Sequence, residues 1–285
     1  MRVANEIFEL RQIRDLWIRE GRSIGLVPTM GFLHEGHLSL VRESVRNCDR
    51  TVASIFVNPA QFGPEMDLDR YPQSFDRDCE ILREEGVDLV FAPSPKMIYP
   101  EGFSTWIEVE DLVEHLDGAS RPGYFRGIAT VVTKLFNLVR PSSAYFGQKD
   151  IQQAIVIQRV ARDLDLEVEV VIMPIIRESD GLAMSSRNHY LNPEQRQIAA
   201  TLYRALMKAK ELFDTGERSA AVLKAAAQAV IQSEPKLIID YVEIVDDLSM
   251  QPIKELSGPA YLALACDLEG TRLIDNQKLT IRRQT

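Results

Sequence analysis

Short apolar runs alternate with amphipathic stretches over about the first 175 residues. The run SIGLVP (23–28) is apolar at successive positions, which is typical of a strand buried on both faces. In HLSLVRESVRNC (37–48) apolar residues recur at helical spacing, which predicts a helix with one buried face. The same alternation predicts further strands over 51–59, 87–93, 142–148 and 167–176, and further helices over 74–86, 126–141 and 150–166.

Continuous apolar strands separated by helices predict a parallel sheet covered on both faces, an α/β fold with a Rossmann-like, doubly wound arrangement. Ligands of such sheets bind beyond the carboxyl ends of the strands. The segments that follow the predicted strands are therefore the places to search for chemistry: PTMGFLHEGH (28–37), NPAQFG (58–63), GQKD (147–150) and IRESDGLAMSSRN (176–188).

The pattern changes in the last third of the chain, where a smaller α+β domain is predicted. Its helices are expected over 192–216 and 219–232, and its strands over 237–247 and 260–276. The polar stretch 177–193 lies between the two patterns and is the expected hinge. We therefore expect a Rossmann-like domain over 1–175 and a smaller C-terminal domain over 176–285.

Composition narrows the class of protein. The formal net charge of −9 and the pI of about 5.1 argue against broad binding to nucleic acid or to an anionic membrane surface. Three widely spaced cysteines form no CxxC pair, so neither a disulfide framework nor a zinc ribbon is predicted. With a charged N-terminal stretch that has no apolar signal core, the sequence predicts a cytoplasmic protein without membrane spans.

Two of the four histidines lie together in TMGFLHEGH (29–37), where a predicted strand passes into a predicted helix. His34 and His37 would share one face of the first helical turn. Unpaired backbone N–H groups and the positive end of the helix dipole attract anions there. Gly31 and Gly36 allow a ligand to approach the backbone closely, so the segment predicts a phosphate site.

Two other interpretations of this segment are weaker. The histidines could lie on a surface loop without any function, or they could bind a metal ion. A metal site needs further ligands, and the sequence has neither HExxH spacing nor a cysteine nearby. We therefore expect no protein metal site here.

A second anion-binding pattern occurs in DGLAMSSRN (180–188). Ser185 and Ser186 can donate hydrogen bonds to phosphate oxygens, and Arg187 can bind a phosphate with two N–H groups. A capped helix start is the alternative interpretation of such a loop. Together with HEGH, the segment is similar to the paired HIGH and KMSKS signatures of the nucleotidyltransferase superfamily, in which the two motifs flank the triphosphate of ATP.

Side-chain amides and one lysine follow two other predicted strands. Asn58 and Gln61 suit a neutral or hydroxyl-rich substrate, although an Asn-Pro turn explains Asn58 equally well. Lys149 can neutralise phosphate charge, and Asp150 can cap the helix that carries Gln153.

The motifs PTMGFLHEGHLSLV, SIFVNPAQF, DLVFAPS, SRPGYFRGIATVVTKLFNLV, FGQKDIQQ and DGLAMSSRN occur together and in this order. As a set they resemble the pantothenate synthetase (pantoate–β-alanine ligase) family, and the resemblance continues to TRLIDN near the C-terminus. The resemblance implies condensation of (R)-pantoate with β-alanine through a pantoyl adenylate. ATP, accompanied by Mg²⁺, would be converted to AMP and pyrophosphate.

The resemblance also implies roles for individual residues. His34, His37, Lys149 and Arg187 would be catalytic, with His37 at the position that the family assigns as proton donor. Electrostatic stabilisation of the leaving pyrophosphate is an alternative role, since pyrophosphate is a stable leaving group. Gln61 and Gln153 would hold pantoate, with Asn58 a further candidate. ATP would be bound by Met30, Gly31, Phe32, Leu33, His34, Glu35, Gly36, His37, Gly147, Gln148, Lys149, Asp150, Ile176, Met184, Ser185, Ser186 and Arg187.

Other expectations follow from the same resemblance. The family implies a homodimer, and the C-terminal domain would act as a lid that excludes water from the acyl adenylate. The sequence leaves open whether Mg²⁺ contacts a carboxylate such as Asp150 or only the phosphates. Two other functions remain: nucleotidyl transfer to a phosphorylated acceptor, which the amides of Gln61 and Gln153 disfavour, and a non-catalytic nucleotide-binding module.

Overall fold

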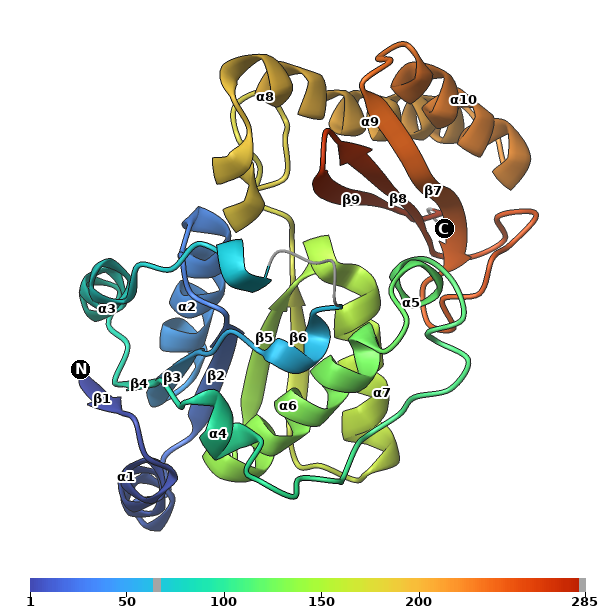
Figure 1. Cartoon of the computed structure of the whole chain (residues 1–285). Coiled ribbons are helices and arrows are strands. Elements are labelled where there is room, and N and C mark those ends of the chain that lie inside the picture. The colour runs from blue at the N-terminus through green and yellow to red at the C-terminus, as the bar shows by residue number, and fades with distance from the viewer. Residues whose placement is uncertain (64–67, 282–285) are drawn as a thin grey trace. The chain divides into compact units, whose positions relative to one another are not determined.

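The computed structural model describes residues 1–63 and 68–281 and contains two sheets (Figure 1). The first sheet has six strands in the order β1-β4-β3-β2-β5-β6, and each neighbouring pair is parallel. Its strands are β1 (Arg2–Ala4), β2 (Ile24–Thr29), β3 (Arg50–Ile55), β4 (Leu89–Phe91), β5 (Ser143–Gly147) and β6 (Glu169–Met173). The expected Rossmann-like, doubly wound sheet is therefore confirmed.

Helices connect these parallel strands and cover the sheet. Leu40 and Val41 of one helix and Leu82 of another pack on strand residues such as Val27 and Val90, in a fully apolar cluster. Apart from the short α5, which is described below with the second unit, the helices up to residue 163 are α1 (Ile7–Arg19), α2 (Glu35–Asn47), α3 (Phe75–Glu84), α4 (Pro95–Ile98), α6 (Tyr124–Val139) and α7 (Ile151–Asp163). Short 3₁₀ turns lie at η1 (Pro59–Gln61), η2 (Leu68–Arg70) and η3 (Gln148–Asp150).

The order of the strands determines where a ligand can bind. Progress along the chain moves outward from β2 through β3 to β4, and then returns to place β5 on the other side of β2. The chain direction across the sheet thus reverses between β2 and β5, and sheets of this kind bind ligands at the carboxyl ends of the strands at such a point. The segments that leave these two strands begin at Met30 and Gln148, so two motifs that were singled out in the sequence start at this point.

The second sheet is antiparallel, with the order β7-β8-β9, and its apolar side packs against helices. Leu206 and Leu223 are fully buried against strand residues such as Leu262 and Leu264. The elements are η4 (Ser186–Tyr190), α8 (Pro193–Ala199), α9 (Thr201–Asp214), α10 (Ala220–Gln232), β7 (Leu237–Asp246), β8 (Ala260–Leu268) and β9 (Thr271–Leu279).

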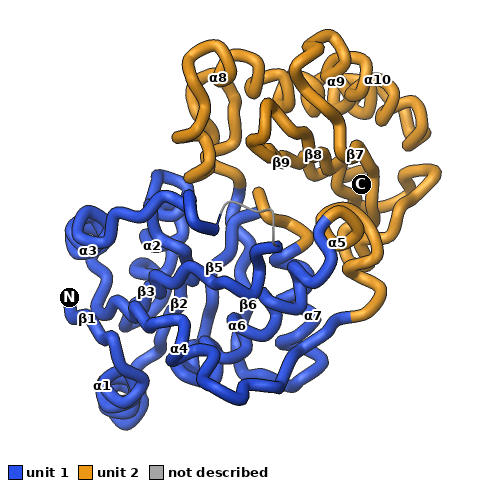
Figure 2. The backbone as a smooth tube through the Cα atoms, in the orientation of Figure 1, with its two compact units in different colours: residues 1–109, 121–148, 153–174 blue, residues 110–120, 149–152, 175–285 orange. Residues whose placement is uncertain are grey.

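By its contacts the chain divides into two compact units (Figure 2). Unit 1 comprises residues 1–109, 121–148 and 153–174, and unit 2 comprises 110–120, 149–152 and 175–285. Two short segments, 110–120 with α5 (Asp117–Ser120) and 149–152, lie within the expected first domain 1–175 but belong with the C-terminal residues. The polar stretch 177–193, which was expected to be a hinge, folds within unit 2.

Several predicted elements need correction at their ends. The strand expected over 51–59 ends at Ile55, because the Asn58-Pro59 step begins a 3₁₀ turn. The helix expected over 192–216 is two helices, which meet at Ala200. The strand expected over 260–276 is a hairpin of β8 and β9, which turns through Glu269 and Gly270 at φ values of 50° and 89°.

Candidate functional site

The loop between β2 and α2 is held in a specific shape by a carboxylate from another helix. Gly31 has a φ of 85° and Phe32 a φ of 50°, so the chain turns sharply before the helix begins. Asp78 on α3 accepts hydrogen bonds from the backbone N–H groups of Phe32 (2.6 Å) and Leu33 (2.9 Å). Its side chain is completely buried. Asp78 therefore fixes the turn that delivers the two histidines.

The sequence analysis did not identify Asp78. Burial raises the pKa of its carboxyl group, and the hydrogen bonds from the two backbone N–H groups oppose that change. The residue lies 45 positions from its partner Leu33, so no local motif connects them. The one available signal was an acidic residue on the buried side of a predicted helix, which requires a partner when it is not exposed.

His34 and His37 cap the start of α2 with their own side chains. Nδ1 of His34 accepts from the backbone N–H of Gly36 at 3.1 Å, and Nδ1 of His37 accepts from the backbone N–H of His34 at 3.3 Å. The two ring centroids lie 4.0 Å apart. Because both Nδ1 atoms accept hydrogen bonds, a neutral ring carries its proton on Nε2. The cap thus makes each histidine an Nε2–H donor at a helix N-terminus.

The amides that follow β3 are linked to the histidine loop within unit 1. Nε2 of Gln61 lies 3.3 Å from Sδ of Met30, so the two predicted segments meet. Asn58 is only 1% exposed and donates from Nδ2 to Oε1 of Gln61 at 3.0 Å. Asn58 is therefore buried and contacts the Gln61 side chain through its own amide.

Two neighbouring glutamines on the first turn of α7 differ in their surroundings. Gln152 is buried; its Oε1 accepts from the N–H of Asp117, and its Nε2 donates to the carbonyls of Leu112 and His115, each at 2.8 Å. Gln153, the predicted substrate ligand, is partly exposed. Gln152 thus has a structural role that the sequence did not reveal.

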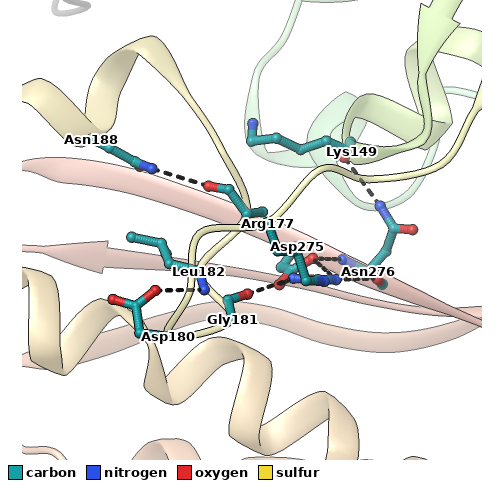
Figure 3. A network of polar contacts seen from close by, with 9 residues as sticks. Lys149, Arg177, Asp180, Gly181, Leu182, Asn188, Asp275 and Asn276 are labelled. Carbon is teal, nitrogen blue, oxygen red and sulfur yellow. Dashed lines mark hydrogen bonds and ion pairs between the residues drawn. The ribbon is translucent and has the colours of Figure 1, made fainter. Parts of the chain in front are cut away.

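Gly147 and Gln148 lie in unit 1. Unit 2 carries the remaining predicted nucleotide-binding residues, namely Lys149, Asp150, Ile176 and Met184 to Arg187. Figure 3 shows Lys149 and its neighbours. The backbone carbonyl of Lys149 accepts from Nδ2 of Asn276 at 3.1 Å. Nζ of Lys149 lies 3.9 Å from the carboxylate of Asp150, whose side chain is 40% exposed. The backbone of Lys149 is therefore anchored to β9, and this anchor determines the point from which its charged side chain extends.

The predicted phosphate loop follows a tight hairpin in unit 2. The N–H of Met184 donates to the carbonyl of Ile176 at 3.0 Å, and Arg177 pairs with Ala183 across the hairpin. Ser185 then caps η4, where its Oγ accepts from the N–H of Arg187 at 3.3 Å. The hairpin thus fixes the point from which the segment Ser185–Arg187 continues.

A buried ion pair attaches this hairpin to β9 (Figure 3). Arg177 binds both carboxylate oxygens of Asp275, at 2.6 and 2.9 Å, and donates to the carbonyl of Gly181 at the hairpin tip. Asp275 is 3% exposed; burial raises the pKa of its carboxyl group, and the guanidinium opposes that change. Consecutive residues of β9, Asp275 and Asn276, thus hold the hairpin before the predicted phosphate loop and the backbone of Lys149.

Across the described ranges 1–63 and 68–281, no helix combines the length and apolarity that a membrane crossing needs.

The chain matches the family model "Pantoate-beta-alanine ligase" over residues 2–278. It is 53% identical over 276 residues to a pantothenate synthetase from Pelotomaculum thermopropionicum, covering 97% of this chain and 98% of the relative. A second one, from Heliobacterium modesticaldum, is 52% identical over 281 residues, covering 99% and 100%.

Solved structures agree with these sequence matches. The chain superposes on pantothenate synthetase from Thermus thermophilus with a TM-score of 0.94 and 45% identity, covering 99% of this chain and 100% of the other. For pantoate-beta-alanine ligase from Francisella tularensis, complexed with beta-gamma ATP and beta-alanine, the TM-score is 0.81 at 33% identity, with 97% of each chain covered. The chain therefore belongs to the pantoate-beta-alanine ligase family, whose members condense pantoate with β-alanine in an ATP-dependent reaction.

Proposed function

We propose that the condensation proceeds in two steps on the residues described above. A carboxylate oxygen of (R)-pantoate attacks the α-phosphorus of ATP, and the bond from that phosphorus to the bridging oxygen breaks to release pyrophosphate. The amine of β-alanine then attacks the acyl carbon of pantoyl adenylate. The bond from that carbon to the AMP oxygen breaks, the nitrogen loses a proton, and pantothenate and AMP leave.

The reciprocal histidine cap is the observation that most strongly supports this proposal. Since the cap uses the backbone N–H groups of His34 and Gly36, the donors proposed for the β- and γ-phosphates are the two Nε2–H groups, at the positive end of the helix dipole. A neutral imidazole that gives up its Nε2 proton would become an imidazolate, which is unfavourable. His34 and His37 therefore act as hydrogen-bond donors that stabilise the charge of the departing pyrophosphate, and His37 needs no role as proton donor.

The remaining phosphate ligands are cationic or neutral donors. Lys149 and Arg187 supply positive charge, and Ser185 and Ser186 supply hydroxyl donors. Ile176 would hold the adenine through its backbone, with Gly147 and Gln148 beside the nucleotide. These assignments follow the family motif, and the anchoring of Lys149 and of the 176–184 hairpin on β9 supports them.

Magnesium would arrive with ATP. Over the residues that the structure describes, no group of three His, Cys, Asp or Glu side chains is placed to hold a metal ion. Mg²⁺ commonly takes most of its ligands from phosphates and water and only one or two from carboxylates, and the accessible Asp150 fits that requirement. The ion would neutralise phosphate charge, and Asp150 would orient it.

Pantoate is a small acid with two hydroxyl groups, so amides suit it better than cations. Gln61 and Gln153 are the proposed ligands, and Gln61 also lies beside the histidine loop through its contact with Met30. Asn58 supports Gln61 from behind, since its amide is already bonded within the protein. We also propose a homodimer, which light scattering coupled to size-exclusion chromatography would test.

The proposal is tested by pyrophosphate release. Wild-type protein with ATP, Mg²⁺ and pantoate, but without β-alanine, should release pyrophosphate, and other small acids should not replace pantoate. AMP and pantothenate should then appear when β-alanine is added. The His37→Ala variant should lose most of the pantoate-dependent release. Folded wild-type protein that releases no pyrophosphate with pantoate would refute the two-step mechanism.

A further inference from the structure

Tyr99 follows α4 and is far in sequence from every predicted site residue. It nevertheless contacts Asn58, one of the predicted substrate-binding amides. Its hydroxyl donates to Oδ1 of Asn58 at 2.8 Å. The direction of this bond is certain, because an amide oxygen only accepts hydrogen bonds. Tyr99 is therefore joined to Gln61 through one intervening side chain.

The Asn58 amide can adopt only one orientation. Its Oδ1 accepts from the N–H of Ala60 at 3.3 Å as well as from Tyr99. Its Nδ2 donates to the carbonyl of Gly127 at 3.2 Å and to Oε1 of Gln61 at 3.0 Å. A flipped amide would face a donor against the Ala60 N–H and an acceptor against the Gly127 carbonyl. The two backbone groups therefore decide the orientation, and all four positions of the amide are satisfied.

The backbone groups are close because α6 carries a glycine where η1 approaches it. A Cβ at position 127 would lie 2.3 Å from the carbonyl oxygen of Ala60. Gly127 thus allows η1, which carries Gln61, to lie directly on the helix. The hydrogen bonds from Tyr99 to Asn58 and from Asn58 to Gln61 form an amide relay. This relay depends on the close approach of the two backbones.

The orientation of Asn58 determines what Gln61 offers to a ligand. Oε1 of Gln61 receives the N–H of Asn58, so its Nε2 is the group directed away from the relay. Nε2 has a thioether, Sδ of Met30, at 3.3 Å, and sulfur is a weak acceptor. An oxygen of a bound substrate competes well for this amide. Gln61 is thereby set to bind an acceptor, such as a carboxylate or hydroxyl oxygen.

Aromatic neighbours hold the Tyr99 ring in place. Its centroid lies 5.1 Å from that of Phe103 and 5.8 Å from that of Trp106, and the Lys134 ammonium lies 5.8 Å from the Tyr99 ring. Lys134 also donates to the carbonyl of Ile98, which precedes Tyr99. Burial raises the pKa of Tyr99 to about 12, so the hydroxyl keeps its proton at neutral pH. The donor that begins the relay is thus held in place and protonated at neutral pH.

We propose that Tyr99 is a positioning residue for the acid substrate: through Asn58 it holds the Gln61 amide with its NH₂ group toward pantoate. This proposal rests on the proposed role of Gln61. Without the hydroxyl, Oδ1 of Asn58 keeps only the longer bond from Ala60, so the Asn58 side chain is held less tightly and positions Gln61 less precisely. The effect should appear in the affinity for pantoate, because ATP does not depend on this amide.

The test compares Tyr99→Phe with Tyr145→Phe, which removes a buried hydroxyl of the same unit that lies beside Cys48. Pyrophosphate release is measured against pantoate and against ATP. We expect the KM for pantoate to rise about 2- to 12-fold in Tyr99→Phe, as the loss of one net hydrogen bond predicts, while the KM for ATP changes less than about 2-fold. Tyr145→Phe should change neither constant.

A double-mutant cycle decides whether Tyr99 acts through Gln61. If it does, Tyr99→Phe should add nothing to the KM for pantoate in a Gln61→Ala background. Additive effects, an unchanged KM for pantoate in Tyr99→Phe, or equal effects in both tyrosine variants would overturn the proposal. Failure of the proposed function gives a different result, since wild-type protein would then release no pyrophosphate with pantoate, or Gln61→Ala would bind pantoate normally.

Discussion

Single hydrogen bonds decide what the most distinctive residues of this protein can do. The two histidines present Nε2–H because their Nδ1 atoms are occupied by backbone N–H groups. A role as donor and a role as acid both require a proton on the outer nitrogen. The proton stays on the histidine if the histidine is a donor and leaves if it is an acid. Substitution of His37 by glutamine and by asparagine distinguishes the two roles.

His37→Gln and His37→Asn are a matched pair for this question. Gln places an N–H near the position of Nε2, whereas Asn places its amide near Nδ1 and can keep only the cap. If His37 is a neutral donor, His37→Gln should retain a rate of pyrophosphate release about 10-fold or more above that of His37→Asn. The rate is measured by single-turnover pyrophosphate release with saturating ATP and pantoate. Equal, near-complete loss of this rate in both variants would instead support proton transfer.

Asp78 allows a second prediction at this scale. Asp78→Asn keeps one good acceptor for the two N–H groups of Phe32 and Leu33, and a buried unpaired N–H costs about 1–3 kcal/mol. Removing a buried charge offsets part of that cost, so the free energy of unfolding should fall only modestly. The turn itself should loosen, and the KM for ATP should rise about 10-fold.

The control for this variant is Asp76→Asn, which changes an exposed carboxylate on the same helical turn. It should leave the KM for ATP unchanged. A normal KM for ATP in Asp78→Asn would mean that the turn before α2 keeps its shape without the carboxylate.

At the scale of elements, strands and helices of the parallel sheet could be predicted because their apolar patterns are local. The same reasoning missed β1, because a three-residue strand has no period to detect, and α1, because Arg14 interrupts the buried face that Leu10 and Trp17 form. It also joined β8 to β9, because the turning residues Glu269 and Gly270 are not the usual Asn-Gly pair.

The candidate site was predictable to the same extent. HEGH and MSSRN are contiguous, so the sequence displays them. Asp78 and Tyr99 reach the site through tertiary packing from 45 and 41 residues away, and no spacing rule contains that information. Asn58 illustrates the limit in the other direction, because its type and position suggested a ligand while its surroundings bind both ends of its amide.

The hairpin before the proposed phosphate loop is the element whose anchoring can be tested. Arg177→Lys keeps the charge beside Asp275 but loses the two parallel hydrogen bonds, since an ammonium cannot match a carboxylate in that way. We expect the KM for ATP to rise about 10-fold and the melting temperature to fall, with the KM for pantoate unchanged. Steady-state pyrophosphate release and thermal unfolding measure the two effects.

Arg196→Lys is the control for that prediction, because Arg196 pairs with Glu178 and Asp180 of the same hairpin through longer, partly exposed contacts. It should change little. If both variants, or neither, weakened ATP binding, the buried pair would not be what positions the loop.

At the scale of the whole molecule, each unit has its own apolar core. The cluster around Leu206 contains only residues of unit 2, and the cluster around Leu82 only residues of unit 1. Both tryptophans, Trp17 and Trp106, belong to unit 1. Tryptophan fluorescence therefore reports the unfolding of unit 1, whereas circular dichroism reports both units.

This arrangement predicts how core cavities affect unfolding in urea. Leu206→Ala and Leu82→Ala each remove a fully buried side chain and should cost about 2–5 kcal/mol in their own unit. If the units unfold separately, Leu206→Ala lowers the midpoint seen by circular dichroism but not the one seen by fluorescence, and Leu82→Ala lowers the fluorescence midpoint. Coincident shifts with both probes would mean that the chain unfolds as one cooperative body.

ATP extends the same experiment to the proposed function. The proposed nucleotide ligands include His34 and His37 of unit 1 and Lys149 and Arg187 of unit 2. A ligand that binds only when both units are folded stabilises whichever unit unfolds first, by about 2.7 kcal/mol at 100 times its Kd. With ATP and Mg²⁺ we therefore expect the circular-dichroism midpoint of Leu206→Ala and the fluorescence midpoint of Leu82→Ala both to rise. A rise in only one of the two variants would assign ATP binding to the unit that this variant weakens.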